Sequence, residues 1–329
     1  MRSCNRVLIL LGSVMHLRVP VFILAFSTLI SGVIACSSQS SRPAPAPFLF
    51  IFDERPFQMD CTDRPAPLPP GPHVVSAGSP PYARTRLDTL NLPLNEVSAL
   101  TIAAESHNWV RIAGANQDHW TVQFCAEGDG NTIDEANGHL QKVSLQRTGG
   151  LLTLNNTDAR GLTGGGGDLL LTAPAGAPVT VHSDAPVQVQ DMAGPVRVST
   201  AQSRATILNT TGRVDAFAMI VDYSGSQGSV ALNASWDVEI KLTATTFRGN
   251  LSANAQRRVQ ALFPPGFQTP IEVYVNRSKD FVCRADFCSK IKKDRVNFLY
   301  RFTYGDTANV SDHIGLRSEN SQVTLDTMQ

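Results

Sequence analysis

The sequence has no excess of charge of either sign. Its 329 residues contain 28 Lys and Arg and 28 Asp and Glu, so the formal net charge at pH 7 is zero. Nucleic-acid binding normally requires a basic excess concentrated on one face. The one basic run, Lys290–Arg295, is interpreted as solvated surface. The composition therefore predicts no nucleic-acid partner.

The sequence also lacks the short motifs of common catalytic and redox sites. It contains no G-x-S-x-G, H-E-x-x-H or C-x-x-C pattern. Gly164–Gly167 lacks the Lys and the Ser or Thr of a phosphate-binding loop and is interpreted as a flexible connection. His107 and His119, near Glu105 and Asp118, hint at a metal site, but their spacing is unspecific. We therefore predict no catalytic residue, no cofactor and no bound metal.

Charged residues are few, at 17% of the chain, whereas hydrophobic residues make up 42%. That hydrophobic share is enough for a packed core. Gly, Thr, Ser and Asn are frequent in the middle of the sequence, and this mixture suits short strands and many turns better than helices. The composition therefore predicts an all-β fold.

Between Val179 and Leu251 a short alternating strand followed by a turn recurs about every nine residues. These strand-and-turn units, or phrases, begin at Val179, Val187, Val196, Ala205, Val214, Val221, Val230, Val238 and Phe247. A fixed short period is typical of a solenoid, whose coils bury their apolar faces against neighbouring coils. We therefore predict a parallel solenoid with short two-strand coils.

In such a coil, alternate phrases stack in parallel. The predicted sheets run through Val179, Val196, Val214, Val230 and Phe247, and through Val187, Ala205, Val221 and Val238. Short turns, among them Ala234–Asp237, would also suit antiparallel hairpins, which would produce a sandwich or a barrel instead. The constant period and the small to medium aliphatic residues facing inward favour the solenoid.

The N-terminal region has the layout of an export signal. Arg18 precedes an apolar run that ends in small residues, and Val33–Cys36 resembles the lipobox of bacterial lipoproteins. The resemblance implies that Cys36 is acylated and anchors an exported protein to a membrane. Ser37 after the cysteine favours the outer membrane, facing either the periplasm or the cell exterior. An ordinary signal peptide with a chance cysteine is the alternative.

These features divide the chain into three parts. Residues 1–36 form the signal peptide with its lipobox, and its start is Met1 or Met15. Residues 37–84 form a tether rich in proline and serine, a composition that favours extended, semi-rigid chain. Residues 85–329 form the β-solenoid domain, with regular repeats at about 179–251 and a C-terminal cap at about 259–329.

Four cysteines remain once Cys4 in the leader and Cys36 are set aside. An even number in an oxidising compartment indicates two disulfides, here among Cys61, Cys125, Cys283 and Cys288. Three connectivities are open, and the short loop between the last two favours joining them, which leaves the first two as the other pair. Zinc binding by these cysteines is the alternative to disulfides, but the spacing is not C-x₂-C and no histidine lies nearby.

A signal, a variable tether and repeated short strands from Leu100 to about Leu251, with turns such as Asn209–Gly212, resemble the bacterial putative-adhesin β-strand-repeat family. Most of that family is a domain of unknown function. The resemblance covers about half of the chain and rests on pattern rather than on an invariant motif. It implies a right-handed parallel β-helix-like or β-roll-like envelope protein without established catalytic residues. Phe298–Tyr304 lies outside it and is predicted to form a final strand or cap.

Stacking the phrases also predicts two pairs of charged residues on the outer faces. Asp222 lies beside Glu239 on one sheet, and Arg197 lies beside Asp215 on the other. An acidic pair can bind Ca²⁺ or perform acid–base chemistry. Outward residues of this kind are more often solvated and paired along the ladder, with Lys241 available to Glu239.

The sequence thus favours a non-enzymatic cell-envelope lipoprotein that serves binding, scaffolding or adhesion. Its outward Thr, Gln, Ser and Asn side chains suit contacts with a polysaccharide or an envelope protein, and the lipid anchor supplies a membrane partner. The molecular ligand stays open. The alternative is a polysaccharide-active β-helix enzyme, a lyase or hydrolase that uses Asp222 and Glu239. A regulatory component of the envelope stress response is a third hypothesis.

Overall fold

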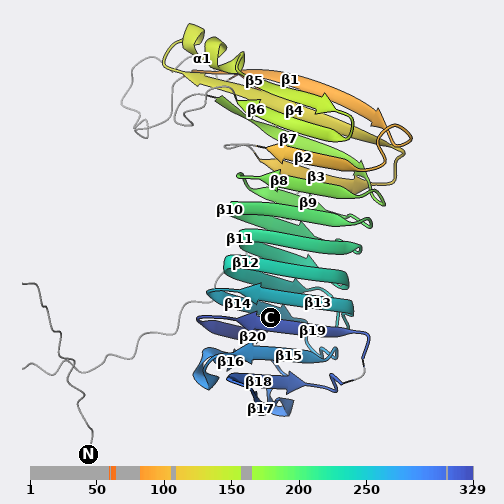
Figure 1. Ribbon diagram of the computed structural model, residues 1–329, viewed down its shortest axis with the longest axis vertical. Helices are drawn as coiled ribbons and strands as arrows, with labels where there is room; N and C mark the ends of the chain where they lie inside the picture. The colour runs from red at the N-terminus through yellow and green to blue at the C-terminus, as the bar shows by residue number, and fades with distance from the viewer. Residues whose placement is uncertain are drawn as a thin grey trace, which may run out of the picture. The chain divides into compact units, whose positions relative to one another are not determined.

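The computed structural model describes residues 59, 61–63, 82–104, 109–156, 165–308 and 310–328. Within them the chain forms twenty β-strands, one α-helix, α1 (Ile133–Leu140), and two 3₁₀ turns, Ser278–Asp280 and Cys288–Lys290. All the strands belong to one open sheet (Figure 1). The predicted all-β class is confirmed. The predicted signal peptide with Cys36, and most of the predicted tether, lie outside the described residues.

The strands are arranged in two ladders, of which the first includes both regular and irregular parts of the sequence. Its neighbouring strands run parallel, in the order β6 (Leu151–Asn156), β2 (Leu100–Ala104), β8 (Val179–Ser183), β10 (Val196–Leu208), β11 (Arg213–Gly225), β12 (Gln227–Leu242), β13 (Arg248–Ala255), β19 (His313–Ser318) and β15 (Ile271–Val275). Antiparallel strands extend it at both ends. At one end β5 (Val143–Thr148) pairs with β6. At the other end β18 (Leu299–Tyr304) pairs with β15, and β17 (Lys292–Val296) pairs with the far side of β18.

The second ladder is built in the same way. Its parallel order is β7 (Gly165–Pro174), β3 (Val110–Ala115), β9 (Val187–Gln190), β10, β11, β12, β14 (Arg258–Phe263), β20 (Gln322–Thr327) and β16 (Phe281–Cys283). Beyond β7 it continues with two long antiparallel strands, β4 (His119–Gly130) and β1 (Tyr82–Pro93).

Strands β10, β11 and β12 take part in both ladders without interruption. Between the two halves of each strand the register shifts, at Thr200/Arg204 in β10 and at Ala218/Ile220 in β11. The turn predicted at Ala234–Asp237 is therefore wrong, because these residues lie inside β12. At this point β12 passes from the first ladder to the second while its backbone stays extended. Two residues of β12 lie opposite a single residue of β11 there, which is a β-bulge.

The predicted neighbour relations between the repeated phrases are mostly confirmed. Val196 lies opposite both Val179 and Val214, and Val214 lies opposite Val230. In the second ladder, Ala205 lies opposite Val187 and Val221, and Val221 lies opposite Val238. The exception is Phe247, because Val230 is opposite Leu251 instead. Phe247 precedes β13, where it is fully buried and its backbone N–H donates to Thr269 Oγ1 at 2.7 Å.

Two rungs are placed out of chain order, which the sequence pattern does not indicate. Strands β2 and β3 lie between β6/β7 and β8/β9, and β19 and β20 lie between β13/β14 and β15/β16 (Figure 1). Asn250 is thus opposite His313, and Arg258 is opposite Gln322. The residues expected to form a cap at 259–329 therefore contribute an interior rung as well as the end strands β17 and β18.

The side chains that face inward from both ladders form one apolar core. Core positions of the first ladder are Val179, Val196, Val214, Val230 and Leu251, none more than 3% exposed, and those of the second are Val187, Ala205, Val221, Val238 and Val259, none more than 1% exposed. The chain alternates apolar and polar residues along these strands, which puts every second side chain into this core. The alternate side chains face outward and form the surfaces on which a site can be built.

Glycines stack where the chain enters the first ladder. Gly194, Gly212, Gly228 and Gly249 each lie against the backbone of the preceding glycine in this column, and a Cβ on Gly212 would come within 2.3 Å of the Gly194 carbonyl oxygen. Gly228 and Gly249 also have positive φ values of 130° and 99°. Because glycine has no Cβ, the backbone segments that enter successive strands approach one another closely here. Gly176, in the first turn of the column, has open space where a Cβ would lie.

Two disulfides connect the expected pairs of cysteines. Cys61 is joined to Cys125 in β4, and Cys283 is joined to Cys288 across a loop of the C-terminal region. The first disulfide holds residues 61–63 against β1, where Asp63 accepts hydrogen bonds from the Thr85 backbone N–H at 2.8 Å and from Arg84 at 2.6 Å.

Candidate functional site

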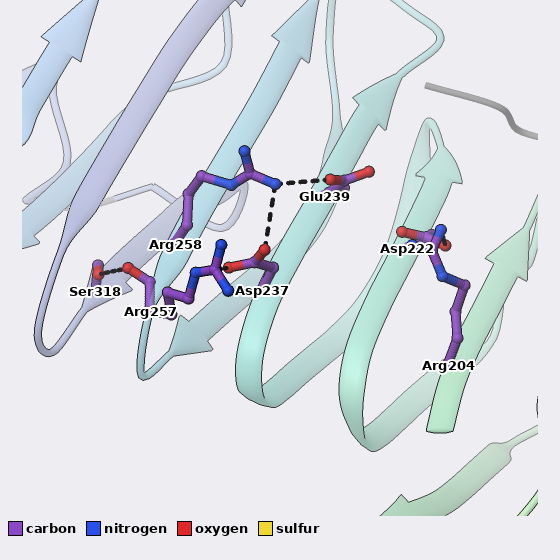
Figure 2. A network of polar contacts seen from close by, with 7 residues as sticks. All are labelled: Arg204, Asp222, Asp237, Glu239, Arg257, Arg258 and Ser318. Atoms are coloured by element: carbon purple, nitrogen blue, oxygen red, sulfur yellow. Dashed lines mark hydrogen bonds and ion pairs between the residues drawn. The ribbon is translucent and has the colours of Figure 1, made fainter. Parts of the chain in front are cut away.

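Charged side chains gather on the outer face of the second ladder. Figure 2 shows Arg204 of β10, Asp222 of β11, Asp237 and Glu239 of β12, and Arg258 of β14 projecting from successive parallel strands. We call these five residues the carboxylate–arginine cluster. The register brings them together because Asp222 is the ladder partner of Glu239, and Asp237 is the ladder partner of Arg258.

Asp222 is bound on one side only. Its Oδ2 accepts a hydrogen bond from Arg204 Nη1 at 2.8 Å and one from Thr206 Oγ1 at 3.3 Å. Its Oδ1 is buried and has no hydrogen-bond partner among the described residues. Glu239 lies on the neighbouring strand, so two carboxylates share this part of the face.

Arg258 joins the other two carboxylates. Its Nη2 donates to Glu239 Oε1 at 3.0 Å and to Asp237 Oδ2 at 3.2 Å. Arg257 adds an ion pair to Asp237, with Nε and Oδ1 separated by 3.8 Å. The sequence predicts Lys241 as the partner available to Glu239, whereas in the structure this carboxylate pairs with Arg258, which comes from β14 rather than from the same strand.

The cluster is far less solvated than outward residues usually are. Only 6% of the Asp222 side chain and 14% of the Glu239 side chain are exposed. Burial raises the pKa of Asp222 to about 6, with Arg204 opposing the rise and the Glu239 charge adding to it. Burial also raises the pKa of Glu239, and the charges of Arg258 and Arg204 oppose that rise. Burial therefore favours the protonated form of Asp222 at mildly acidic pH.

A groove of about 290 Å³ lies on the outer face of the first ladder. Small residues form its floor, namely Ser229 and Ala231 of β12 and Ser252 of β13. Larger polar side chains flank it, namely Arg213 and Asp215 of β11, Asn250 of β13 and His313 of β19. The floor is low because successive coils place small side chains in register there. We call this feature the first-ladder groove.

Polar and aromatic groups are available for contact around the first-ladder groove. Phe217 lies two residues beyond Asp215 on the same strand and is 46% exposed. Arg197 pairs with Asp215 at 3.7 Å, as the sequence predicts. His313 Nδ1 and Asn250 Oδ1 lie 2.8 Å apart across the strands. The groove thus offers hydrogen-bonding groups of both kinds, and the exposed Phe217 ring lies beyond its lining on the same strand.

Among the described residues, the remaining predicted positions are not brought together into a metal or phosphate site. His119 contacts Asp118 at 3.0 Å on the surface, while Glu105 and His107 lie outside the described residues. No group of three or more His, Cys, Asp and Glu able to hold a metal ion occurs among the residues that the structure describes. The described part of the predicted glycine connection, residues 165–167, belongs to β7 and pairs with β4, so the interpretation as a flexible connection is wrong for these three residues.

Comparison with known proteins finds similarity only among solved structures, and at low identity. No family model and no curated protein match the chain. Among solved structures, a putative cell adhesion protein from Clostridium sporogenes is 8% identical with a TM-score of 0.31, over 74% of this chain and 99% of that one. A putative adhesin from Bacteroides fragilis is 11% identical with a TM-score of 0.34, over 74% and 97%. A putative lipid binding protein from Parabacteroides distasonis is 9% identical with a TM-score of 0.25, over 73% and 96%.

Within the described residues, no helix has the length and apolar character needed to cross a bilayer.

Proposed function

We propose that this protein is a non-enzymatic, adhesin-like component of the bacterial cell envelope that binds an extended ligand in the first-ladder groove. The observation that carries the proposal is the groove itself, whose small floor and polar flanks come from four consecutive coils. Ligand sites are commonly concave surfaces with a few well-placed polar groups. A site assembled across coils suits a chain-like ligand that runs from rung to rung.

The proposed architecture is a right-handed parallel β-helix-like solenoid. Two parallel ladders that share β10, β11 and β12 support it, because each of these strands contributes one half to either ladder. Parallel connections within one sheet are almost always right-handed. In a solenoid the outer faces are continuous surfaces along which equivalent residues repeat.

A polysaccharide is the ligand that the groove suits best. Phe217 offers an exposed ring, and aromatic rings contact the apolar faces of ring-shaped ligands. Arg213, Asp215 and Asn250 offer hydrogen-bond donors and acceptors to hydroxyl or carboxylate groups. An envelope protein is the other expected partner and would use the same polar surface.

The test is binding of the purified protein to a panel of neutral and acidic bacterial polysaccharides. We expect Phe217→Ala and Arg213→Ala each to weaken binding at least about fivefold, the effect of losing one modest contact. Trp109→Ala is the matched control, because Trp109 is 44% exposed but precedes β3 of the second ladder. Equal loss in all three variants, or no binding to any polysaccharide, would contradict the proposed site.

The proposed location is an exported one, with Cys36 acylated. The supporting observations are the lipobox-like Val33–Cys36 and two disulfides, which form in oxidising compartments. Cys36→Ala should release the protein from membranes, as measured by fractionation of cells. Continued membrane association of this variant would count against the lipid anchor.

The alternative of a polysaccharide-active enzyme rests on Asp222 and Glu239, adjacent carboxyl groups whose pKa values are both raised. Their engagement by Arg204 and Arg258 favours a structural role instead. Activity against acidic glycans, with and without calcium, distinguishes the two hypotheses. The enzyme hypothesis requires activity that Asp222→Ala and Glu239→Ala abolish.

A further inference from the structure

The hairpin formed by β17 and β18 carries the most exposed aromatic side chain among the described residues. Phe298 lies in its turn and is 87% exposed, compared with 48% for Trp236 and 46% for Phe217. The preceding Asn297 has a positive φ of 57°, a conformation that tight hairpin turns use. Val296 and Leu299, which flank the turn, are half-buried. The hairpin tip is therefore apolar and projects a phenyl ring into solvent.

Basic side chains lie along β17 behind this tip and in the turn that precedes the strand. Lys290, Lys292, Lys293 and Arg295 are exposed, and none of them forms an ion pair within the described part of the chain. The acidic residue of the segment, Asp294, is already engaged by Arg301 of β18. The basic run is therefore a concentrated positive charge on a protein whose net charge is zero.

The positive charges lie on both faces of the hairpin. Lys293 and Arg295 lie over the Tyr300 ring, at 5.0 Å and 5.6 Å from its centroid. Lys292, one residue along the strand, projects from the opposite face. At about 3.3 Å per strand residue, Lys293 lies roughly 10 Å behind Val296. The hairpin thus has an aromatic side chain at its end and basic side chains on both of its faces behind that end.

Protection of an exposed strand edge accounts for only part of this arrangement. β17 pairs with β18 alone among the described strands, and lysines on an edge strand discourage pairing with a second copy. That function does not require an aromatic ring at the tip. An apolar end that enters the boundary of a bilayer to a depth of about 5–10 Å, followed by cations, is the arrangement by which interfacial segments bind membranes. Anionic headgroups supply the complementary charge.

We propose that the β17–β18 hairpin binds the surface of an anionic lipid bilayer, with Phe298 at the headgroup–acyl boundary and Lys290 and Lys292 facing the anionic headgroups from further back along the hairpin. This contact is separate from polysaccharide binding in the first-ladder groove and from acylation of Cys36. It gives the folded domain its own membrane contact at the end of the sheet opposite β1 (Figure 1).

The experiment introduces a reporter at the tip. The full-length Phe298→Trp variant and the parent protein are mixed with vesicles of phosphatidylglycerol or of phosphatidylcholine, both with brominated acyl chains that quench nearby tryptophan fluorescence. The difference between variant and parent isolates the tip, whether or not the N-terminus is anchored. Phe217→Trp is the matched control, because it places the same reporter on β11.

We expect quenching of the added tryptophan at position 298 in phosphatidylglycerol vesicles only, and none at position 217. Adding Lys290→Gln and Lys292→Gln should weaken the vesicle affinity roughly 25-fold, because each cation near an anionic surface contributes about fivefold. Both lysines are chosen because, unlike Lys293 and Arg295, they do not lie over an aromatic ring.

Absence of quenching at position 298 would overturn the proposal. Equal quenching in both lipids, or an affinity that the lysine substitutions leave unchanged, would overturn the role of the charges. Dimerisation without vesicles that Phe298→Ala abolishes would instead assign the tip to contacts between copies of the chain.

Discussion

Asp222 and Glu239 lie opposite each other on adjacent parallel strands, and each carboxylate is bound by an arginine from a different coil. Arg204 precedes them along the ladder and Arg258 follows them, so the two adjacent carboxylates lie between two arginines (Figure 2). This arrangement lets a sheet face carry several charges with little exposure. It also makes the stability of the coils dependent on protonation.

The first prediction concerns the pH dependence of stability. Because burial raises the pKa of Asp222 to about 6, above its value of about 3.9 in an unfolded chain, the folded protein binds more protons between these pH values. The free energy of unfolding should therefore fall as the pH rises from about 4 to 6, by about 2–3 kcal/mol from this residue. Urea unfolding of the parent and of Asp222→Asn at several pH values measures it, and the variant should lack this component.

Asp215→Asn is the control for that prediction. Asp215 also pairs with an arginine along the ladder, but its side chain is 42% exposed. It should keep the parent pH dependence between pH 4 and 6. An unchanged slope in Asp222→Asn would show that another group binds the proton.

The second prediction concerns the glycine column. Gly212→Ala should lower the free energy of unfolding by about 1–3 kcal/mol, because the new Cβ would overlap the carbonyl oxygens of Ala193 and Gly194. Gly176→Ala, in the same column, should change it by less than about 0.5 kcal/mol, since a Cβ there meets no atom. Denaturant unfolding compares the two variants, and similar effects would contradict close packing in this column.

The third prediction compares the disulfides. Replacing Cys61 and Cys125 by serine should cost about 4 kcal/mol, because this disulfide closes a loop of 64 residues. Replacing Cys283 and Cys288 should cost about 2 kcal/mol, because the sequence separation there is 5 residues. Unfolding measured without reductant tests the ranking. A larger loss at the short loop would show that strain or packing, rather than loop closure, determines the effect.

The fourth prediction concerns the interior rung made by β19 and β20. Leu316→Ala should cost about 2–5 kcal/mol, as truncation of a fully buried leucine does. Leu299→Ala in the end strand β18, where the side chain is half-buried, should cost less than about 1 kcal/mol. Thermal unfolding distinguishes an interior rung from a cap, because a cap would make the two losses similar.

The pairing of the regular phrases could be predicted because strict alternation and a constant period leave few registers. Val196 meets Val179 and Val214 for that reason. The period fails at Phe247, since an intervening turn lengthens that coil and moves Leu251 into register with Val230. A local pattern does not report how long each turn is.

The interior rung at β19 and β20 could not be predicted in the same way. Asn250 and His313 are far apart in the sequence, and no short-range signal connects them. The helix α1 did leave a signal, because Thr132 and Glu135 have the spacing of a capping box. Thr132 Oγ1 accepts from the Glu135 backbone N–H at 3.1 Å, as that spacing indicates.

The candidate sites were predicted in part. The register that places Asp222 beside Glu239 follows from the repeat, but their burial and their arginine partners depend on packing between coils. Arg258 comes from a strand beyond the last regular phrase. The first-ladder groove was not predicted, because it arises from small residues at equivalent positions of different coils, which only the three-dimensional register reveals.

The rung made by His313–Ser318 and Gln322–Thr327 determines when the two ladders can be completed during synthesis of the protein. Chains emerge from the ribosome N-terminus first, so β15 and β16 become available before the strands that separate them from β13 and β14. Until then β15 and β16 have no parallel neighbour within the described chain. Synthesis must pass Thr327 before the ladders can close, and a product terminated before β19 therefore loses the strands that join β15 and β16 to the rest.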